Sequence, residues 1–120
     1  MAIISNPLTL DLSDIQGMVT RGYSKLMETA YLMLKVENAE QAKEWIKSSL
    51  PLVDSADISN SKERTLHMAF TYHGLSALGM DKENIDAFPN PFREGIATPD
   101  RSRILGDYGE NATSKWEWGA

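Results

Sequence analysis

Two stretches of alternating apolar and polar residues constrain this chain more than any other feature. In the first stretch, Thr29–Val36, every second side chain is aliphatic: Ala30, Leu32, Leu34 and Val36. In the second stretch, Arg64–Thr71, the same period appears in Leu66, Met68 and Phe70. A period of two places successive side chains on opposite faces of an extended backbone. The sequence therefore predicts two strands, each with one apolar face.

Helical signals separate and follow these stretches. Asn38 is expected to cap a helix, with Gln41 completing a capping-box pattern, and Pro51 ends that helix near Leu50. Trp45 lies on the apolar side of this helix and is predicted to be a core residue. A second, short helix is predicted over His73–Leu78, with Gly79 in the left-handed position at its C-terminal end.

The other segments carry weaker patterns. We expect a loop over 18–23, a short strand or an extended loop over 52–58, an extended segment over 88–92, one helical turn over 101–105 and a polar loop over 106–111. The resulting order of strand, helix, weak strand, strand and helix is typical of an α+β fold. It predicts one ferredoxin-like (split β-α-β) domain over residues 1–120 that lacks its last strand. A long irregular C-terminal segment and an open sheet edge follow from that prediction.

Composition excludes several function classes. The net charge is −5 and the pI is about 4.9, so no basic surface for nucleic acid is predicted. The longest apolar run, Tyr31–Leu34, is too short to span a bilayer, and the first residues lack the pattern of a signal peptide. The chain has no cysteine, which fits a reducing compartment. We therefore expect a cytoplasmic protein that contacts neither membrane nor nucleic acid.

Few residues suggest chemistry. His67 and His73 are the only histidines, and two histidines six positions apart do not supply the three or four ligands of a zinc site. Structural roles are expected instead, with His67 on the back of a strand and His73 in the first turn of the short helix. Asp107 is expected to bond nearby backbone amides in its loop. The glycines form no phosphate-binding motif. No catalytic and no metal-binding residue is predicted.

Two further groups leave alternatives open. Arg93, Arg101 and Arg103 are suited either to a carboxylate, such as a porphyrin propionate, or to ion pairs with neighbouring acidic side chains. Trp116 and Trp118 alternate as at the start of a strand, and without a following strand we expect them to form an exposed contact surface.

An ordered series of short motifs resembles the dye-decolorizing (DyP-type) haem peroxidases. The series runs through Asp14-Ile-Gln-Gly17, the block Leu66–Gly79, Phe88-Pro89, Phe92-Arg-Glu-Gly95, Arg103-Ile-Leu-Gly-Asp107 and Trp116-x-Trp118-Gly119. It covers nearly the whole chain in the order of the family. The resemblance implies a ferredoxin-like α+β fold and an enzyme that uses peroxide to oxidise dyes and other bulky reductants.

The resemblance also implies where the chemistry lies. Family members have two such domains and bind haem b mainly through the second, with a distal aspartate in a G-x-x-D-G motif. That motif does not occur here: Gly106-Asp107 does not match it, and neither His67 nor His73 occupies the position of the proximal ligand. Family resemblance therefore assigns no catalytic residue to this chain, and its cofactor-binding residues are unknown.

Three hypotheses follow. The chain is the N-terminal portion of a DyP-type peroxidase and needs a C-terminal half, in cis or in trans, for haem binding and activity. Alternatively, it is a non-enzymatic α+β module that self-associates or binds a partner through an open sheet edge. The third hypothesis is that the chain holds haem by itself through His67 or His73.

Overall fold

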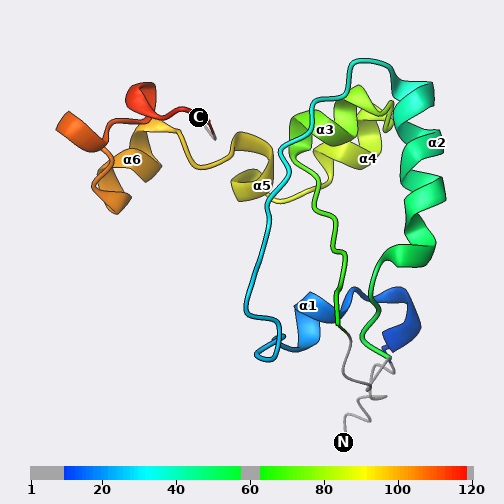
Figure 1. The fold of residues 1–120 in the computed structure, drawn as a ribbon. Coiled ribbons are helices and arrows are strands. Elements are labelled where there is room, and N and C mark those ends of the chain that lie inside the picture. Colours follow the sequence, from blue (N-terminus) through cyan, green and yellow to red (C-terminus); the bar gives the residue numbers. More distant parts are fainter. Residues whose placement is uncertain (1–9, 58–62, 119–120) are drawn as a thin grey trace, which may run out of the picture. The chain divides into compact units, whose positions relative to one another are not determined.

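The computed structural model describes residues 10–57 and 63–118. It divides into two units. Unit 1 comprises Met1–Leu34 and Glu44–Ala69, and unit 2 comprises Lys35–Lys43 and Phe70–Ala120. Short helices joined by irregular segments make up the described residues of both units (Figure 1). No helix within these ranges is long and apolar enough to cross a membrane.

The helical elements are short. In chain order they are η1 (Leu12–Asp14), α1 (Gly17–Thr20), α2 (Ala39–Ser49), η2 (Leu50–Leu52), α3 (Tyr72–Ala77), α4 (Lys82–Asp86), α5 (Asn90–Glu94), α6 (Pro99–Leu105), η3 (Gly109–Asn111) and η4 (Thr113–Lys115). Only α2 exceeds two helical turns, so most of these elements depend on caps and local contacts for their stability.

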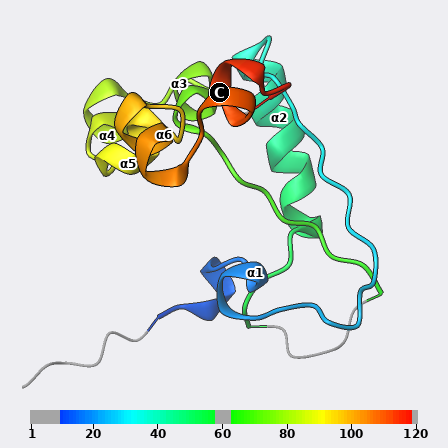
Figure 2. The same ribbon diagram turned by 90° about the vertical axis from the view of Figure 1, so that its left-hand side faces the viewer.

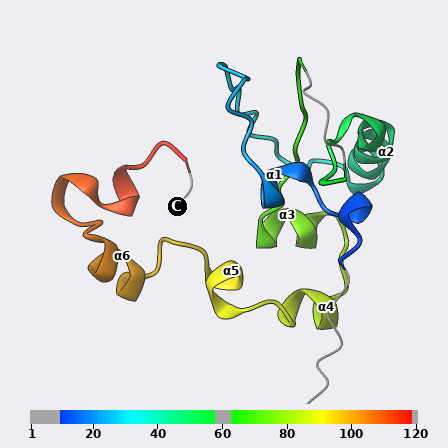
Figure 3. The ribbon, with the colours of Figure 1, turned by 90° about the horizontal axis from the view of Figure 1, so that it is seen from below.

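The predicted ferredoxin-like α+β fold is wrong for the residues that the structure describes. Their ribbon carries no strand arrow in any view (Figure 1, Figure 2, Figure 3), and the only pairings are single bridges, Gln16 with Ser55 and Val53 with Leu66. The strands expected over 29–36 and 64–71 are absent from the described residues. The segment 52–58, expected as a short strand or an extended loop, forms no strand within its described residues 52–57. The described ranges therefore contain no sheet and no open sheet edge.

The physical reason lies in the partners of the backbone. From Met27 to Glu37 no backbone group hydrogen-bonds to another described backbone group. At Met68 the side chain of Gln16 occupies the position of a neighbouring strand: the Met68 N–H donates to Gln16 Oε1 at 2.9 Å, and the Met68 carbonyl accepts from Gln16 Nε2 at 2.8 Å. Alternation shows which side chains share a face, but a strand also requires a ladder partner.

Helix α2 confirms the sequence-based prediction. The Gln41 N–H donates to Asn38 Oδ1 at 3.0 Å, and the helix gives way to a 3-10 turn that contains Pro51. Trp45, however, is 51% exposed, so its predicted place in a core is wrong. In the described ranges Ile85, on α4, is the only buried apolar residue, at 3% exposure. None of the described residues therefore packs against the apolar face of α2 closely enough to bury Trp45.

Helix α3 is also confirmed. The Thr71 hydroxyl accepts from the Gly74 N–H at 3.0 Å, which caps the N-terminus. Gly79 takes a positive φ of 89°, the left-handed conformation expected after the last turn. Helix α4 packs against α3 within unit 2 and contributes the buried Ile85 (Figure 1).

The predicted irregular C-terminal segment is instead built from short helices. The segment expected to be extended contains α5, because Pro91 takes the second helical position, where its missing N–H costs nothing. The turn expected over 101–105 is confirmed as part of α6, which Thr98 caps. The loop expected over 18–23 begins instead with α1, and the polar loop expected over 106–111 contains η3.

Candidate functional site

A buried carboxylate forms the centre of unit 1. Asp54 is 1% exposed, and its Oδ2 accepts a hydrogen bond from the hydroxyl of Tyr23. The Arg21 guanidinium lies 3.4 Å from the same oxygen and also donates to the Ser55 carbonyl at 3.0 Å. A buried carboxylate is stabilised only when it is hydrogen-bonded and charge-paired, and these two side chains supply both kinds of contact.

The backbone of Asp54 joins distant parts of the chain. Its carbonyl accepts from the Gly17 N–H at 2.9 Å, and its N–H donates to the Leu66 carbonyl at 3.1 Å. One residue thus holds the start of α1 on one side and the segment after Arg64 on the other. The two hydrogen bonds between the Gln16 side chain and the Met68 backbone join the same two parts of the chain, next to Gly17.

Position 17 requires glycine because the side chains of Tyr23 and Asp54 lie too close to leave room for a Cβ atom. A Cβ at this position would lie 2.1 Å from the Tyr23 hydroxyl and 3.1 Å from Asp54 Oδ2. The Tyr23 hydroxyl occupies the space because its hydrogen bond holds it against Asp54. Any larger residue at position 17 must displace that hydroxyl or the helix that carries the residue.

His67 packs against this cluster. Its ring centroid lies 5.1 Å from that of Tyr23, and the Arg21 guanidinium carbon lies 5.7 Å from the Tyr23 centroid. Both ring nitrogens of His67 are buried and have no hydrogen-bond partner among the described residues. The prediction that His67 lies on a strand is wrong, because the surrounding segment pairs only through the single bridge of Leu66. Buried ring nitrogens leave no open position for a ligand.

The electrostatics of the cluster favour a protonated phenol. Burial, followed by the hydrogen bond to Asp54, raises the pKa of Tyr23 above its usual 10.0. The Tyr23 hydroxyl therefore keeps its proton and donates a hydrogen bond to the Asp54 carboxylate throughout the neutral pH range. We call this set of residues, Arg21, Tyr23, Asp54 and His67, the Asp54 cluster. Neither of the two surface pockets described below includes any of its members, and the backbone hydrogen bonds of Asp54 join the start of α1 to the segment after Arg64 within unit 1.

A second polar cluster lies in unit 2, around Asp86 of α4. Its carboxylate accepts hydrogen bonds from Lys82 and from the Tyr72 hydroxyl, the latter at 3.1 Å, and pairs with Arg93 at 3.6 Å. The hydrogen bond from Lys82 is the main reason that the pKa of Asp86 falls below 3.8. His73 lies in the first turn of α3, as predicted, with its ring edge-on to Tyr72 at 5.4 Å.

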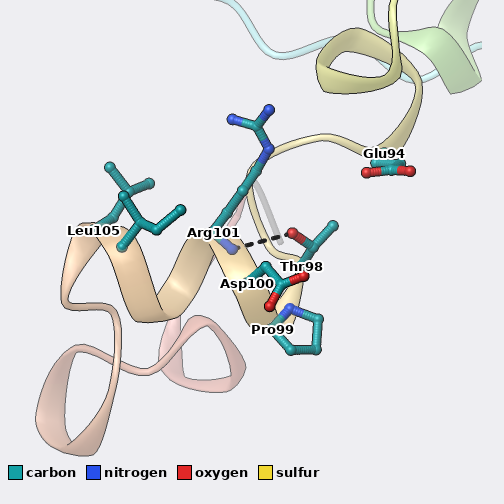
Figure 4. A pocket seen from close by; sticks show the side chains of 7 residues that line it. Glu94, Thr98, Pro99, Asp100, Arg101 and Leu105 are labelled. Carbon is teal, nitrogen blue, oxygen red and sulfur yellow. Dashed lines mark hydrogen bonds between the residues drawn. The ribbon is translucent and has the colours of Figure 1, made fainter.

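The three predicted arginines do not form one anion site. Arg93 pairs with Asp86, whereas Arg101 and Arg103 make no ion pair with any described carboxylate. Arg101 does line a surface pocket of about 460 Å³ around the start of α6, with Glu94 and Asp100 among its other lining residues (Figure 4). The mixed charges of this pocket make it a poor match for an anion. Asp107 donates its backbone N–H to the Ser102 carbonyl at 2.8 Å.

Trp116 and Trp118 contribute to a more apolar surface pocket. Together with Ile96 and Glu117 they line a volume of about 510 Å³. The Trp116 indole N–H donates to the Asn111 carbonyl at 3.0 Å, which fixes that ring, while Trp118 remains 69% exposed. Across the residues that the structure describes, no group of three or more histidine or acidic side chains could hold a metal ion.

Comparison with known proteins was made by family model and by sequence similarity to curated proteins. The chain matches no model of a known protein family and no curated protein. The resemblance to DyP-type peroxidases therefore rests on the ordered motifs of the sequence alone.

Proposed function

We propose that this chain is the N-terminal portion of a DyP-type haem peroxidase, an enzyme class that oxidises dyes and other bulky reductants with hydrogen peroxide. The observation that carries the proposal is the ordered series of motifs from Asp14 to Gly119. On this proposal the chain supplies part of the scaffold, and a C-terminal half supplies the haem ligand and the distal acid–base groups.

The described residues do not fit a haem by themselves. A haem site needs an axial ligand with an accessible donor atom and an enclosing apolar pocket. The nitrogens of His67 are buried against Tyr23, and His73 lines neither surface pocket. The hypothesis that either histidine binds haem within the isolated chain therefore loses support.

A haem titration of the purified chain, followed by its absorbance spectrum, tests this proposal in two stages. The isolated chain is expected to give no saturable Soret band. Joining it to the C-terminal half of a DyP-type peroxidase, by co-expression or fusion, is expected to give a Soret band and peroxide-dependent dye oxidation. His73→Ala serves as the control, because an exposed histidine outside the haem site should change neither signal.

Either of two results would contradict the proposal. One is the absence of haem absorbance and dye oxidation after the C-terminal half has been added and shown to be folded. The other is a one-to-one Soret band in the isolated chain that disappears in His73→Ala, because the chain would then contain its own ligand. Co-purification of the chain with the C-terminal half shows whether the two halves bind each other. A pair that co-purifies but gives no haem absorbance therefore counts against the proposal, whereas halves that do not bind do not test it.

An alternative function also has a specific observation in its favour. Large apolar side chains of the segment before α2 are exposed in the described structure. Soluble proteins seldom leave such a series uncovered unless it contacts another molecule. We therefore keep the proposal of a non-enzymatic module that self-associates or binds a partner. A chain that stays strictly monomeric and binds no C-terminal half would contradict it.

A further inference from the structure

The open pocket around the two C-terminal tryptophans, within unit 2, has the make-up of a ligand site. Its lining residues are Ile96, Trp116, Glu117 and Trp118, and we call it the tryptophan pocket. Its volume of about 510 Å³ lies within the range of small-molecule sites, roughly 300–1,000 Å³. Three of its four side chains are aliphatic or aromatic, and the fourth is a carboxylate. The pocket therefore combines apolar walls with one negative charge.

One of the two indoles is held in place before any ligand binds. The Trp116 backbone N–H donates to the Thr113 carbonyl at 3.1 Å, and its indole N–H donates to the Asn111 carbonyl at 3.0 Å. Both hydrogen bonds lie within a stretch of six residues, so they do not depend on distant parts of the chain. A ring that is fixed in advance loses little conformational entropy when a ligand contacts it. Trp118 is 69% exposed and is accessible to the same ligand.

No aromatic ring and no cation of the described residues lies against either indole. The ring–ring contacts in these ranges all involve other side chains, and the cation that lies over a ring is Arg21 over Tyr23. Lys115 precedes Trp116 in the chain but pairs with Glu110 at 3.0 Å. Tryptophan has the most favourable ring face for a cation. The described part of the chain therefore leaves two such faces for a cation from outside.

Glu117 adds an uncompensated negative charge at the same place. Within the described ranges it forms no ion pair with a lysine, arginine or histidine. The whole chain is also acidic, with a net charge of −5, which raises the concentration of cations near its surface. A cation that reaches the indoles thus meets an attractive carboxylate and no competing positive charge from the described residues.

We propose that the tryptophan pocket binds a small quaternary ammonium compound, with its methylated nitrogen against the indoles of Trp116 and Trp118 and beside the Glu117 carboxylate. A primary ammonium group is strongly hydrated and needs acceptors for three N–H donors, of which this mainly apolar lining supplies few. A quaternary ammonium group has no N–H, so it binds through its charge and its methyl groups alone. Ile96 offers those methyl groups an apolar contact. The proposal does not depend on the peroxidase assignment.

The indole N–H signals in a proton–nitrogen correlation spectrum test this binding residue by residue. Choline chloride, added at constant ionic strength, is expected to shift the Trp116 and Trp118 signals saturably in the millimolar range. The signal of Trp45, which lies on α2 outside the pocket, should stay in place. The matched neutral probe is the carbon analogue of choline, in which a tert-butyl group replaces the trimethylammonium group. It has nearly the same shape without the charge, so it is expected to bind about tenfold more weakly.

Substitutions in the same titration separate the pocket from general attraction to an acidic chain. Trp118→Leu is expected to weaken choline binding about fivefold, and Glu117→Gln about threefold. Trp45→Leu and Glu44→Gln are the matched controls, because they remove an exposed indole and an exposed carboxylate from α2, and both should leave the affinity unchanged.

Three results would overturn the proposal. They are the absence of a saturable shift at Trp116 and Trp118 in the natural chain, equal affinity for choline and its neutral analogue, and equal weakening by Glu44→Gln and Glu117→Gln. The first two use the natural chain, so they do not depend on how well a variant folds. Because none of these readouts involves haem, each result leaves the peroxidase proposal to its own test.

Discussion

Substitution of Gly17 by alanine is the sharpest test of the Asp54 cluster. The added Cβ would lie 2.1 Å from the Tyr23 hydroxyl, a distance that no native contact tolerates. The chain must then either strain its backbone, at about 1–3 kcal/mol, or swing Tyr23 away. Swinging Tyr23 away loses a hydrogen bond to a charged acceptor, worth about 1.5–3 kcal/mol. Either route destabilises unit 1 by about 2 kcal/mol.

Amide hydrogen exchange measured by NMR reports this loss locally. The N–H of Asp54, which donates to the Leu66 carbonyl, is a suitable probe because it lies inside the cluster. A change of about 2 kcal/mol in the free energy of local opening corresponds to roughly 30-fold faster exchange. Gly22→Ala is the matched control, because a Cβ at that position meets no atom within 4 Å. It should leave the exchange of the Asp54 amide nearly unchanged.

A double-mutant cycle identifies the cause. Tyr23→Phe removes the hydroxyl that the new methyl group would strike, so Gly17→Ala should cost much less in the Tyr23→Phe background than alone. The reasoning is refuted if Gly17→Ala accelerates exchange no more than Gly22→Ala. It is also refuted if the two substitutions at positions 17 and 23 prove additive, because the clash would then not involve the hydroxyl.

Three further outcomes are expected. Because the pKa of Tyr23 is raised above 10.0, its stabilisation is present below that pH and is lost as pH rises through the folded pKa; Tyr23→Phe should flatten the alkaline loss of melting temperature. Because the hydrogen bond from Lys82 lowers the pKa of Asp86 below 3.8, its stabilisation is lost as pH falls through the folded pKa, and Asp86→Asn should flatten the acid branch of the same curve. Gln16→Leu should speed exchange of the Met68 amide about tenfold or more, because two backbone groups lose their partners.

Local signals in the sequence were sufficient wherever the deciding interaction is local. Asn38 and Gln41 lie three residues apart, and Thr71 and Gly74 do as well, so the caps of α2 and α3 belong to the chain near them. Pro91 was misread because proline fits both an extended segment and the first turn of a helix. The predicted strands failed for the opposite reason, since a strand depends on a distant partner that alternation does not reveal.

The Asp54 cluster was missed for the same physical reason. A carboxylate within the weakly apolar stretch Leu52–Ala56 is an available signal, because a buried Asp54 must find partners. Nothing in the sequence, however, indicates that those partners are Arg21 and Tyr23, more than thirty positions away. The core position predicted for Trp45 failed because an apolar helical face shows only what could be buried, and not what covers it.

The bridge between Gln16 and Met68 also determines when unit 1 can form. The two residues are 52 positions apart, so closing the intervening loop costs about 3.5 kcal/mol in chain entropy beyond a fixed term. At synthesis rates of about 5–20 residues per second, the glutamine leaves the ribosomal peptidyl-transferase centre about 3–10 s before its partner is made. During that interval Gln16 lacks both of its hydrogen bonds to Met68, and Asp54, once it is made, lacks its bond to the Leu66 carbonyl. The N-terminal part of unit 1 therefore completes its contacts only after a much later part of the chain has been translated.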